Sequence, residues 1–176
     1  THVDRSADVP VLKIPTRYNA ATDFIDRHLA EGRGDRIAFI DDAGTTTYAA
    51  LAEQVNRAGN MPLDMGLRAE DRVPLGRQDS VAFPVLFFGA IKAGILPVPV
   101  NTLLTTDDYA YMLQDSRALA VFVSDALWPT VGPATSGQSR LRHRVIVGQG
   151  GDGLPTMHGL MQQASPDLEA AETLAD

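Results

Sequence analysis

The sequence contains no cysteine among its 176 residues. Disulfide bonds and thiolate metal sites within this chain are therefore excluded, and nothing marks an oxidising compartment. Basic residues are also scarce, because 15 lysines and arginines stand against 22 acidic residues, which gives a formal net charge of −7. A nucleic-acid-binding domain usually carries a basic face, so we expect no nucleic-acid partner.

Targeting signals and membrane-spanning runs are missing as well. The first ten residues, THVDRSADVP, lack the charged-then-apolar pattern of a signal peptide. The apolar run from Val81 to Ile91 is too short to span a bilayer, and Lys92 interrupts it. We therefore expect a cytoplasmic protein with no membrane partner. The soft, acidic stretch that stops at Asp176 leads us to expect a fragment of a longer protein.

What the sequence does contain is the composition of a globular domain, with 44% apolar and 21% charged residues. Helix and strand patterns alternate from residue 36 to 148, after an extended arm over residues 1–17. This alternation predicts an α/β fold with a doubly wound, mainly parallel sheet and helices on both faces. The expected strands are short apolar runs, as in sheets that are covered on both sides.

The stretch VAFPVLFFGAIKAGILPVPVN, residues 81–101, is the most informative part of the chain. A helix that is apolar all round belongs in a core, so we expect residues 81–93 to form a buried helix. Gly94 should end this helix, and residues 95–100 should form a strand. We predict that Leu86, Phe87 and Ile91 are fully buried.

Local signals place the other elements. We expect helix N-caps at Asn19 and Thr47 and a capping box over Thr105 to Asp108. Residues 36–47 should form a hairpin, residues 118–123 and 144–147 strands, and the region of Leu160 and Met161 a short helix.

The segment from residue 61 to 78 fits the pattern poorly. Pro62 should end the preceding helix early, and Pro74 and Gly76 weaken the strand expected at 71–77. The polar stretches 149–157 and 164–176 are expected to be mobile.

Few residues suggest chemistry on their own. Residues 148–153 match G-x-G-x-x-G, but no helical pattern follows, which favours a surface loop over a nucleotide site. No P-loop motif is present, and the four histidines lie too far apart to suggest a metal site. Arg140, Arg142 and Arg144 alternate along a candidate strand, and a solvated face is favoured over a phosphate contact.

Six stretches taken together resemble the amino-terminal part of the adenylate-forming enzymes, the acyl-CoA synthetase superfamily. In chain order they are Tyr18-Asn-Ala-Ala21, Asp35-Arg-Ile-Ala38, Thr46-Thr-Tyr-Ala-Ala-Leu51, Ala69-Glu-Asp-Arg-Val73, Phe88-Gly-Ala-Ile-Lys-Ala-Gly94 and Val98-Pro-Val-Asn101. Within that superfamily, the run from Asn101 to Ala118 is most similar to the benzoate-CoA ligases. The resemblance covers residues 18 to about 147.

The resemblance implies that residues 18–176 are the amino-terminal subdomain of an aryl-CoA ligase, and a homodimer is the oligomeric state to test at full length. Such enzymes take an aromatic acid, ATP with Mg²⁺, and CoA as substrates. Their phosphate loop, acid pocket and carboxy-terminal domain follow the part seen here. We therefore assign no catalytic residue to this chain and expect it to be inactive alone. Some relatives meet CoA through an arginine where this chain has Leu103, so that contact does not carry over.

Residues on a ligand path should lie at the carboxyl ends of the strands, where open α/β sheets bind ligands. Asn101 and Thr102 end one expected strand, and Asp79 and Ser80 follow another. Two structural alternatives stay open, since Asn101 could serve only its own loop and Ser80 only as an N-cap. A free-standing, non-catalytic module that binds a partner or small ligand is the alternative to a ligase.

Overall fold

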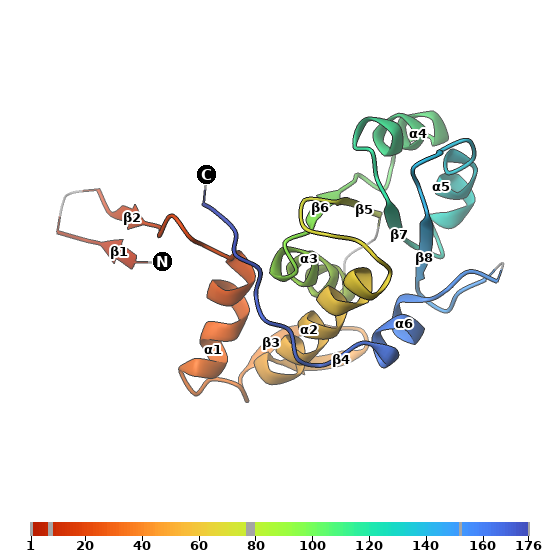
Figure 1. Ribbon diagram of the computed structural model, residues 1–176. Coiled ribbons are helices and arrows are strands. Elements are labelled where there is room, and N and C mark those ends of the chain that lie inside the picture. The colour runs from red at the N-terminus through yellow and green to blue at the C-terminus, as the bar shows by residue number, and fades with distance from the viewer. Residues whose placement is uncertain (1, 7–8, 77–79, 152, 176) are drawn as a thin grey trace.

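The fold is built on a parallel sheet. The computed structural model describes residues 2–6, 9–76, 80–151 and 153–175, and the main sheet formed by these residues has four strands in the order β6-β5-β7-β8 (Figure 1). Their bounds are Arg72–Gly76 for β5, Leu96–Pro99 for β6, Ala120–Ser124 for β7 and His143–Val147 for β8. Every neighbouring pair is parallel. The strand order reverses between β5 and β7, which confirms the doubly wound sheet.

Helices cover both faces of this sheet (Figure 1). One face carries α2 (Tyr48–Asp64) and α3 (Ala82–Lys92), and the other carries α4 (Thr106–Asp115) and α5 (Trp128–Ala134). Successive strand residues divide between two cores, because side chains alternate across a strand. Phe122 and Val145 belong to the α2–α3 core, whereas Val121, Val123 and Ile146 belong to the α4–α5 core. The two-sided arrangement is therefore confirmed, although α5 was not foreseen.

The helix α3 is less enclosed than its sequence suggests. Leu86 is buried as predicted, but Phe87 and Ile91 are only partly buried, so this part of the prediction was wrong. The sheet and α2 cover only part of the helix surface, and the rings of Phe83 and Phe87 stack 5.9 Å apart. Conversely, Lys92 is buried, with its Nζ 2.8 Å from carboxylate oxygens of Asp26.

Two glycines allow α2 and α3 to pack very closely. A Cβ on Gly89 would lie 2.8 Å from the Cβ of Ala58, and one on Gly59 would lie 2.7 Å from the Gly89 carbonyl oxygen. Any larger side chain at these positions would push the helices apart. Gly89, in the Phe88–Gly94 stretch that carries the family resemblance, is therefore required for the packing of α3 on α2.

The irregular segment at 61–78 is accommodated within regular elements. Pro62 does not end α2, which continues to Asp64, so that prediction was wrong. The buried Pro62 forgoes a single bond in the last helical turn, and burial offsets that loss. Pro74 lies inside β5, where pairing with β7 starts only at Leu75. The proline thus shortens one ladder without breaking the strand.

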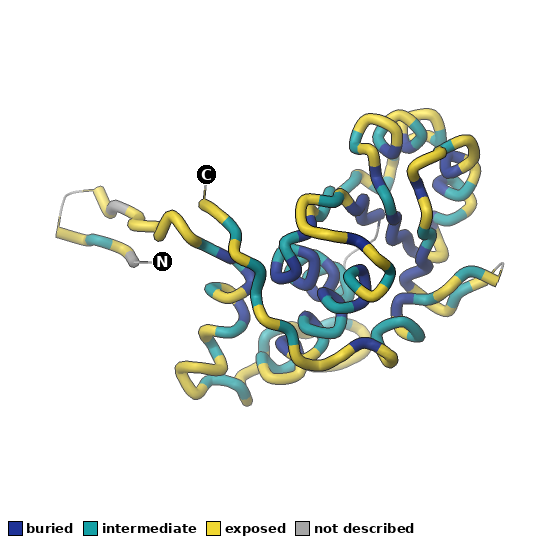
Figure 2. The backbone as a smooth tube through the Cα atoms, in the orientation of Figure 1, coloured by how far each residue is buried: buried dark blue, intermediate teal, exposed yellow. Residues whose placement is uncertain are grey.

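The amino-terminal arm forms a small hairpin. β1 (His2–Asp4) pairs antiparallel with β2 (Val11–Lys13), and a short π-helical element, η1 (Thr22–Asp26), then leads into α1 (Arg27–Ala30). Asn19 Oδ1 accepts a hydrogen bond from the Ala21 N–H, as an N-cap should. Figure 2 shows the arm mostly exposed, in contrast to the buried sheet.

The remaining predicted elements are present. β3 (Ile37–Asp41) and β4 (Gly44–Thr47) form the expected hairpin. Thr47 caps α2, and Thr105 and Asp108 form a complete capping box at α4. The last helix, α6, spans Met157–Gln163.

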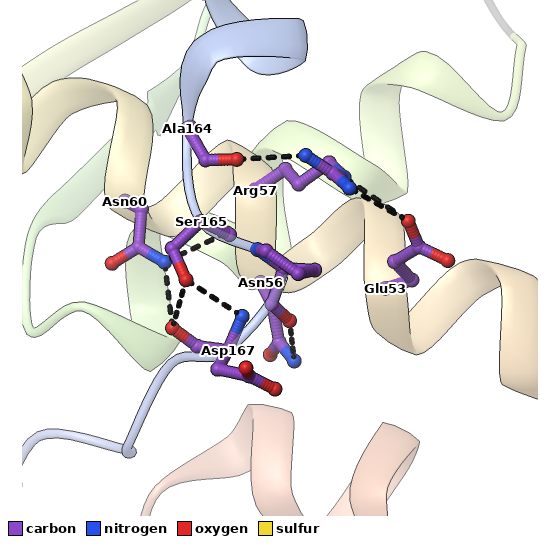
Figure 3. Close-up of polar contacts among 8 residues, drawn as sticks. Glu53, Asn56, Arg57, Asn60, Ala164, Ser165 and Asp167 are labelled. Atoms are coloured by element: carbon purple, nitrogen blue, oxygen red, sulfur yellow. Dashed lines mark hydrogen bonds and ion pairs between the residues drawn. The ribbon is translucent and has the colours of Figure 1, made fainter.

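The C-terminal segment, residues 164–175, starts along α2, and hydrogen bonds join its first residues to that helix, whereas a mobile stretch was expected from the sequence. Asn60 Nδ2 donates to the carbonyl oxygens of Ser165 and Asp167, each at 2.9 Å (Figure 3). Arg57 donates to the Ala164 carbonyl at 2.7 Å, and Asn56 donates to a carbonyl of the same segment at 2.8 Å. Partly buried polar side chains of α2 therefore hold this segment, together with the buried Ala164 and with Leu168, which packs against the core.

Candidate functional site

A large cavity lies where the carboxyl end of β8 meets the amino-terminal ends of α3 and α6. Its volume is about 1000 Å³. Polar atoms from α2 and α6 line it beside apolar ones, and its polar lining includes Gln54, Arg57, His158 and Gln162. It thus occupies the edge of the sheet at which open α/β folds bind ligands.

Ser80 stands beside this cavity, at the start of α3. Its Oγ accepts a hydrogen bond from the Ala82 N–H at 3.2 Å, and the Val81 N–H donates to Asp41 Oδ2 at 3.1 Å. Ser80 also lines a cavity of about 380 Å³ formed with β3, and Val81 borders both cavities. The Ser80 hydroxyl therefore binds a backbone N–H at the start of α3, where Val81 is the N-cap residue, and a ligand role for Ser80 stays a prediction. Asp79 lies outside the described residues.

Asn101 serves the turn that leads from β6 to α4. Its Oδ1 accepts a hydrogen bond from the Leu103 N–H at 2.9 Å, and its carbonyl accepts one from Tyr109 Oη at 2.7 Å. Burial raises the pKa of Tyr109, so the phenol stays protonated as the donor. Asn101 is exposed, whereas Thr102 is half-buried beside it.

Asn101 and Ser80 thus lie in different surroundings. The hydrogen bonds of Asn101 run to its own turn and to α4, while those of Ser80 and Val81 run to α3 and β3. Leu103, the residue after Thr102, is 89% exposed. The ligand role of all four residues on the expected ligand path stays a prediction.

The glycine-rich stretch at 148–153 is a loop rather than a nucleotide cradle. Gln149 N–H donates to Asp125 Oδ2 at 2.8 Å, so a carboxylate occupies the position beside Gly148. The next helix, α6, begins only at Met157 behind its own cap, Thr156. Bound phosphate would meet the negative charge of Asp125, which supports the surface-loop interpretation.

The cavity-lining residues Arg57 and His158 were missed by sequence reasoning. They come from α2 and α6, and no motif connects elements so far apart in the sequence. Arg57 is bound to Glu53 and to the Ala164 carbonyl, which makes its first role structural (Figure 3).

Among residues 2–6, 9–76, 80–151 and 153–175, no group of three histidine or acidic side chains could hold a metal ion. No helix of this part is long and apolar enough to cross a membrane.

A family model for the AMP-binding enzymes matches residues 26–172. The chain belongs to this family. The match spans the sheet, both layers of helices and most of the C-terminal segment, so the family fold accounts for nearly all of the described architecture.

Individual relatives narrow the similarity. The benzoate–CoA ligase of Thauera aromatica is 44% identical over 98% of this chain and 33% of its own length. A 4-hydroxybenzoate/benzoate–CoA ligase of Rhodopseudomonas palustris is 47% identical over 74% of this chain and 24% of its own length. The chain therefore spans about a third, or less, of the curated relatives it matches.

Solved structures agree with these relatives. A benzoate CoA ligase from Burkholderia xenovorans superposes with a TM-score of 0.80 at 36% identity, covering 89% of this chain and 30% of that one. The anthranilate CoA ligase AuaEII, in complex with anthranoyl-AMP, gives a TM-score of 0.85 at 28% identity over 92% of this chain and 30% of that one. These similarities confirm both the fold class and the superfamily expected from the sequence.

Proposed function

We propose that this chain is the amino-terminal part of an AMP-forming aryl-CoA ligase that acts on benzoate or a closely related aromatic acid. The observation that carries the proposal is the 44% identity to a benzoate–CoA ligase over 98% of this chain. Long-chain-fatty-acid–CoA ligases match at only about 30% identity, which favours an aromatic substrate over an aliphatic one.

The proposed reaction has two steps. The carboxylate of the aromatic acid attacks the α-phosphorus of ATP, pyrophosphate leaves, and an aryl-adenylate forms. The thiol of CoA then attacks the carbonyl carbon, loses its proton, and displaces AMP to give the aryl-CoA. Mg²⁺ would accompany ATP.

In the proposed enzyme, this chain is a scaffold whose parallel sheet presents a ligand-binding cavity at the carboxyl ends of its strands. The sheet and its two layers of helices carry the cavity at the carboxyl end of β8. Residues elsewhere in the longer protein supply the reacting groups. ATP and CoA are cytoplasmic substrates, so we also propose a cytoplasmic location. A homodimer of the longer protein is part of the same proposal.

The test is an assay of the full-length protein. With benzoate, ATP, Mg²⁺ and CoA, it should form benzoyl-CoA and release AMP, while the 176-residue chain alone should give no pyrophosphate exchange. A full-length protein that ignored benzoates and accepted long aliphatic acids would contradict the substrate class. A native stop codon near Asp176 would instead support the alternative, a free-standing non-catalytic module. The similarity to ligases speaks against that alternative.

A ligand role for Asn101 has its own test in the full-length enzyme. Asn101→Ala should raise the Michaelis constant for CoA or benzoate at an unchanged melting temperature. The matched control is Asn101→Asp, which keeps the oxygen that accepts from the Leu103 N–H. A lower melting temperature with normal kinetics in the alanine variant would show that Asn101 serves only its turn.

A further inference from the structure

The amino-terminal hairpin has an unpaired edge. Within the described residues, β2 pairs only with β1, and Figure 1 shows the pair extending away from the body of the molecule. Leu12 is 62% exposed and Ile14 is 49% exposed. An isolated two-stranded ribbon is marginally stable in water, and three strands are usually needed. An open edge with apolar side chains is also a surface onto which another strand can add.

The C-terminal segment already runs toward this edge. Its last described residues lie antiparallel to the base of the arm, with Arg17 opposite Leu174. Tyr18 N–H donates to the Thr173 carbonyl at 2.9 Å, and Ala175 N–H donates to the Thr16 carbonyl at 2.9 Å. On the arm, this short ladder ends at Thr16. Ile14 lies two residues further along the arm, toward the amino terminus.

The register of the ladder determines which arm residues can pair with a continuation of the C-terminal segment. Thr16 and Tyr18 direct their backbone groups toward residues 173–175, and these directions alternate along an extended strand. Ile14 and Leu12 therefore direct their N–H and C=O groups to the same side. The missing N–H of Pro15 falls on the other side, so the proline does not interrupt the ladder.

The C-terminal segment is held in place before it reaches the arm. Asn60 and Arg57 bind its first residues, and Asn19 Nδ2 donates to the Ala171 carbonyl at 3.2 Å. Ala171 N–H in turn donates to the Lys92 carbonyl at 2.8 Å. The direction of the chain at Thr173 to Ala175 is thus fixed by α2, α3 and the start of the first helix.

We propose that, in the longer protein, the residues that directly follow Asp176 continue this ladder as a third strand along Ile14, Lys13 and Leu12. The arm then becomes a three-stranded antiparallel sheet with β2 in its centre. The occupant is this chain's own continuation, because the register of residues 173–175 directs that segment along this edge. The inference rests on the proposed function, in which this chain is the amino-terminal part of a longer ligase.

The register can be tested by disulfide formation in the full-length protein. Lys13 would stand opposite the second residue after Asp176 as a non-hydrogen-bonded pair, the geometry in which Cα atoms lie about 4.5 Å apart. Cysteines at these two positions should form an intramolecular disulfide readily, because their Cα separation falls in the range that disulfides require. This part of the chain contains no cysteine, and cysteines elsewhere in the protein are changed to serine first.

The controls shift the second cysteine by one residue in either direction, with Lys13→Cys kept. The shifted cysteine would point to the opposite face, so little cross-link should form. Mass spectrometry under non-reducing conditions measures the yield, and circular dichroism verifies that each variant is folded. Equal yields at all three positions, or no cross-link at the matched one, would overturn the proposal.

Other results have distinct meanings. A disulfide-linked dimer in place of the intramolecular bond would show that a second copy occupies the edge, and would also overturn the proposal. Ligase activity is assayed separately. A matched cross-link in a protein without benzoate activity would support the ladder and contradict the proposed substrate class. An enzyme that is active on benzoate but forms no cross-link would support the substrate class and contradict the ladder.

Discussion

The central sheet and the C-terminal segment are held in place by different kinds of interaction. In the sheet, buried apolar side chains such as Phe122 and Val145 pack against helices on both faces. In the C-terminal segment, the backbone carbonyls of residues 164–167 accept hydrogen bonds from Asn56, Arg57 and Asn60. Apolar burial is visible in a sequence window, whereas these hydrogen bonds join positions more than 100 residues apart.

The two kinds of anchoring should also fail differently. Loss of a buried side chain in the sheet removes contacts from the whole core and lowers the global free energy of unfolding. Loss of one donor on α2 should release the C-terminal segment while the sheet stays folded, because regions with few apolar contacts open locally.

The largest effect is expected in the sheet itself. Phe122→Ala should lower the free energy of unfolding by about 3–5 kcal/mol, because a fully buried aromatic side chain leaves a cavity. Phe87→Ala, on the partly covered side of α3, serves as the comparison and should cost clearly less. Urea unfolding followed by fluorescence of Trp128, the single tryptophan, measures both. Equal losses would show that Phe87 is covered as completely as Phe122.

The next effect tests the close contact between α2 and α3. Gly89→Ala should destabilise the chain by about 1–3 kcal/mol, because the new methyl group would press on the Ala58 side chain and on backbone. Gly34→Ala is the control. Gly34 has no positive φ, and its added Cβ would lie at an ordinary contact distance, 3.6 Å, from the Cβ of Ala49. A similar loss in both variants would mean that helix contact is not the cause.

A smaller and more local effect is expected for the C-terminal segment. Asn60→Ala removes the donor for two carbonyl groups and should weaken the docking of the segment by about 1–2 kcal/mol. Limited proteolysis should then cut residues 164–175 faster, with the urea midpoint of the sheet little changed. Gln114→Ala, at an exposed position on α4, is the control. Unchanged proteolysis would show that the apolar contacts of the segment suffice.

The smallest effect depends on pH. Burial and then the nearby Arg33 and Arg27 lower the pKa of His28 below 6.5 in the folded chain. The neutral imidazole accepts from Arg33 Nε at 3.1 Å and stacks on Tyr48. Its contribution is therefore complete above the unfolded pKa and is lost as the pH falls through the folded one. Unfolding at about pH 7 and about pH 5 should show a smaller difference in His28→Gln than in the parent. An equal difference would exclude His28 as the source.

Much of the fold could be predicted from the sequence because its signals are local. Caps such as Thr47 and the box at Thr105 and Asp108 depend on residues three apart, and the apolar strands and α3 stand out as runs. The effect of Pro62 was predicted wrongly because the sequence shows the helical hydrogen bond that proline removes. It does not show the burial of the Pro62 side chain, which offsets that loss. The helix α5 was missed because Pro129 and Pro133 conceal its pattern, although one sits in the first turn, where proline is tolerated.

The candidate site was less predictable, because cavities depend on distances between elements. Ser80 lies between β5 and α3, as the sequence predicted, while its ligand role stays a prediction. Arg57 and His158 face the same cavity from α2 and α6, and only the docking of α6 brings them together. The buried state of Lys92 required knowledge of Asp26 and Asn56, whose oxygens each lie 2.8 Å from its Nζ.

The two prolines of β6 have a consequence for synthesis of the chain. Leu96 N–H donates to Asp71 and Val100 N–H to Leu75, so the alternate positions, Pro97 and Pro99, face away from β5. β6 lies at one end of the sheet, and these prolines leave its outer side without the donors that another strand would need. If this segment leaves the ribosome before the rest of the protein, strands of neighbouring nascent chains on one messenger would find no N–H donor at Pro97 or Pro99, which disfavours their addition there.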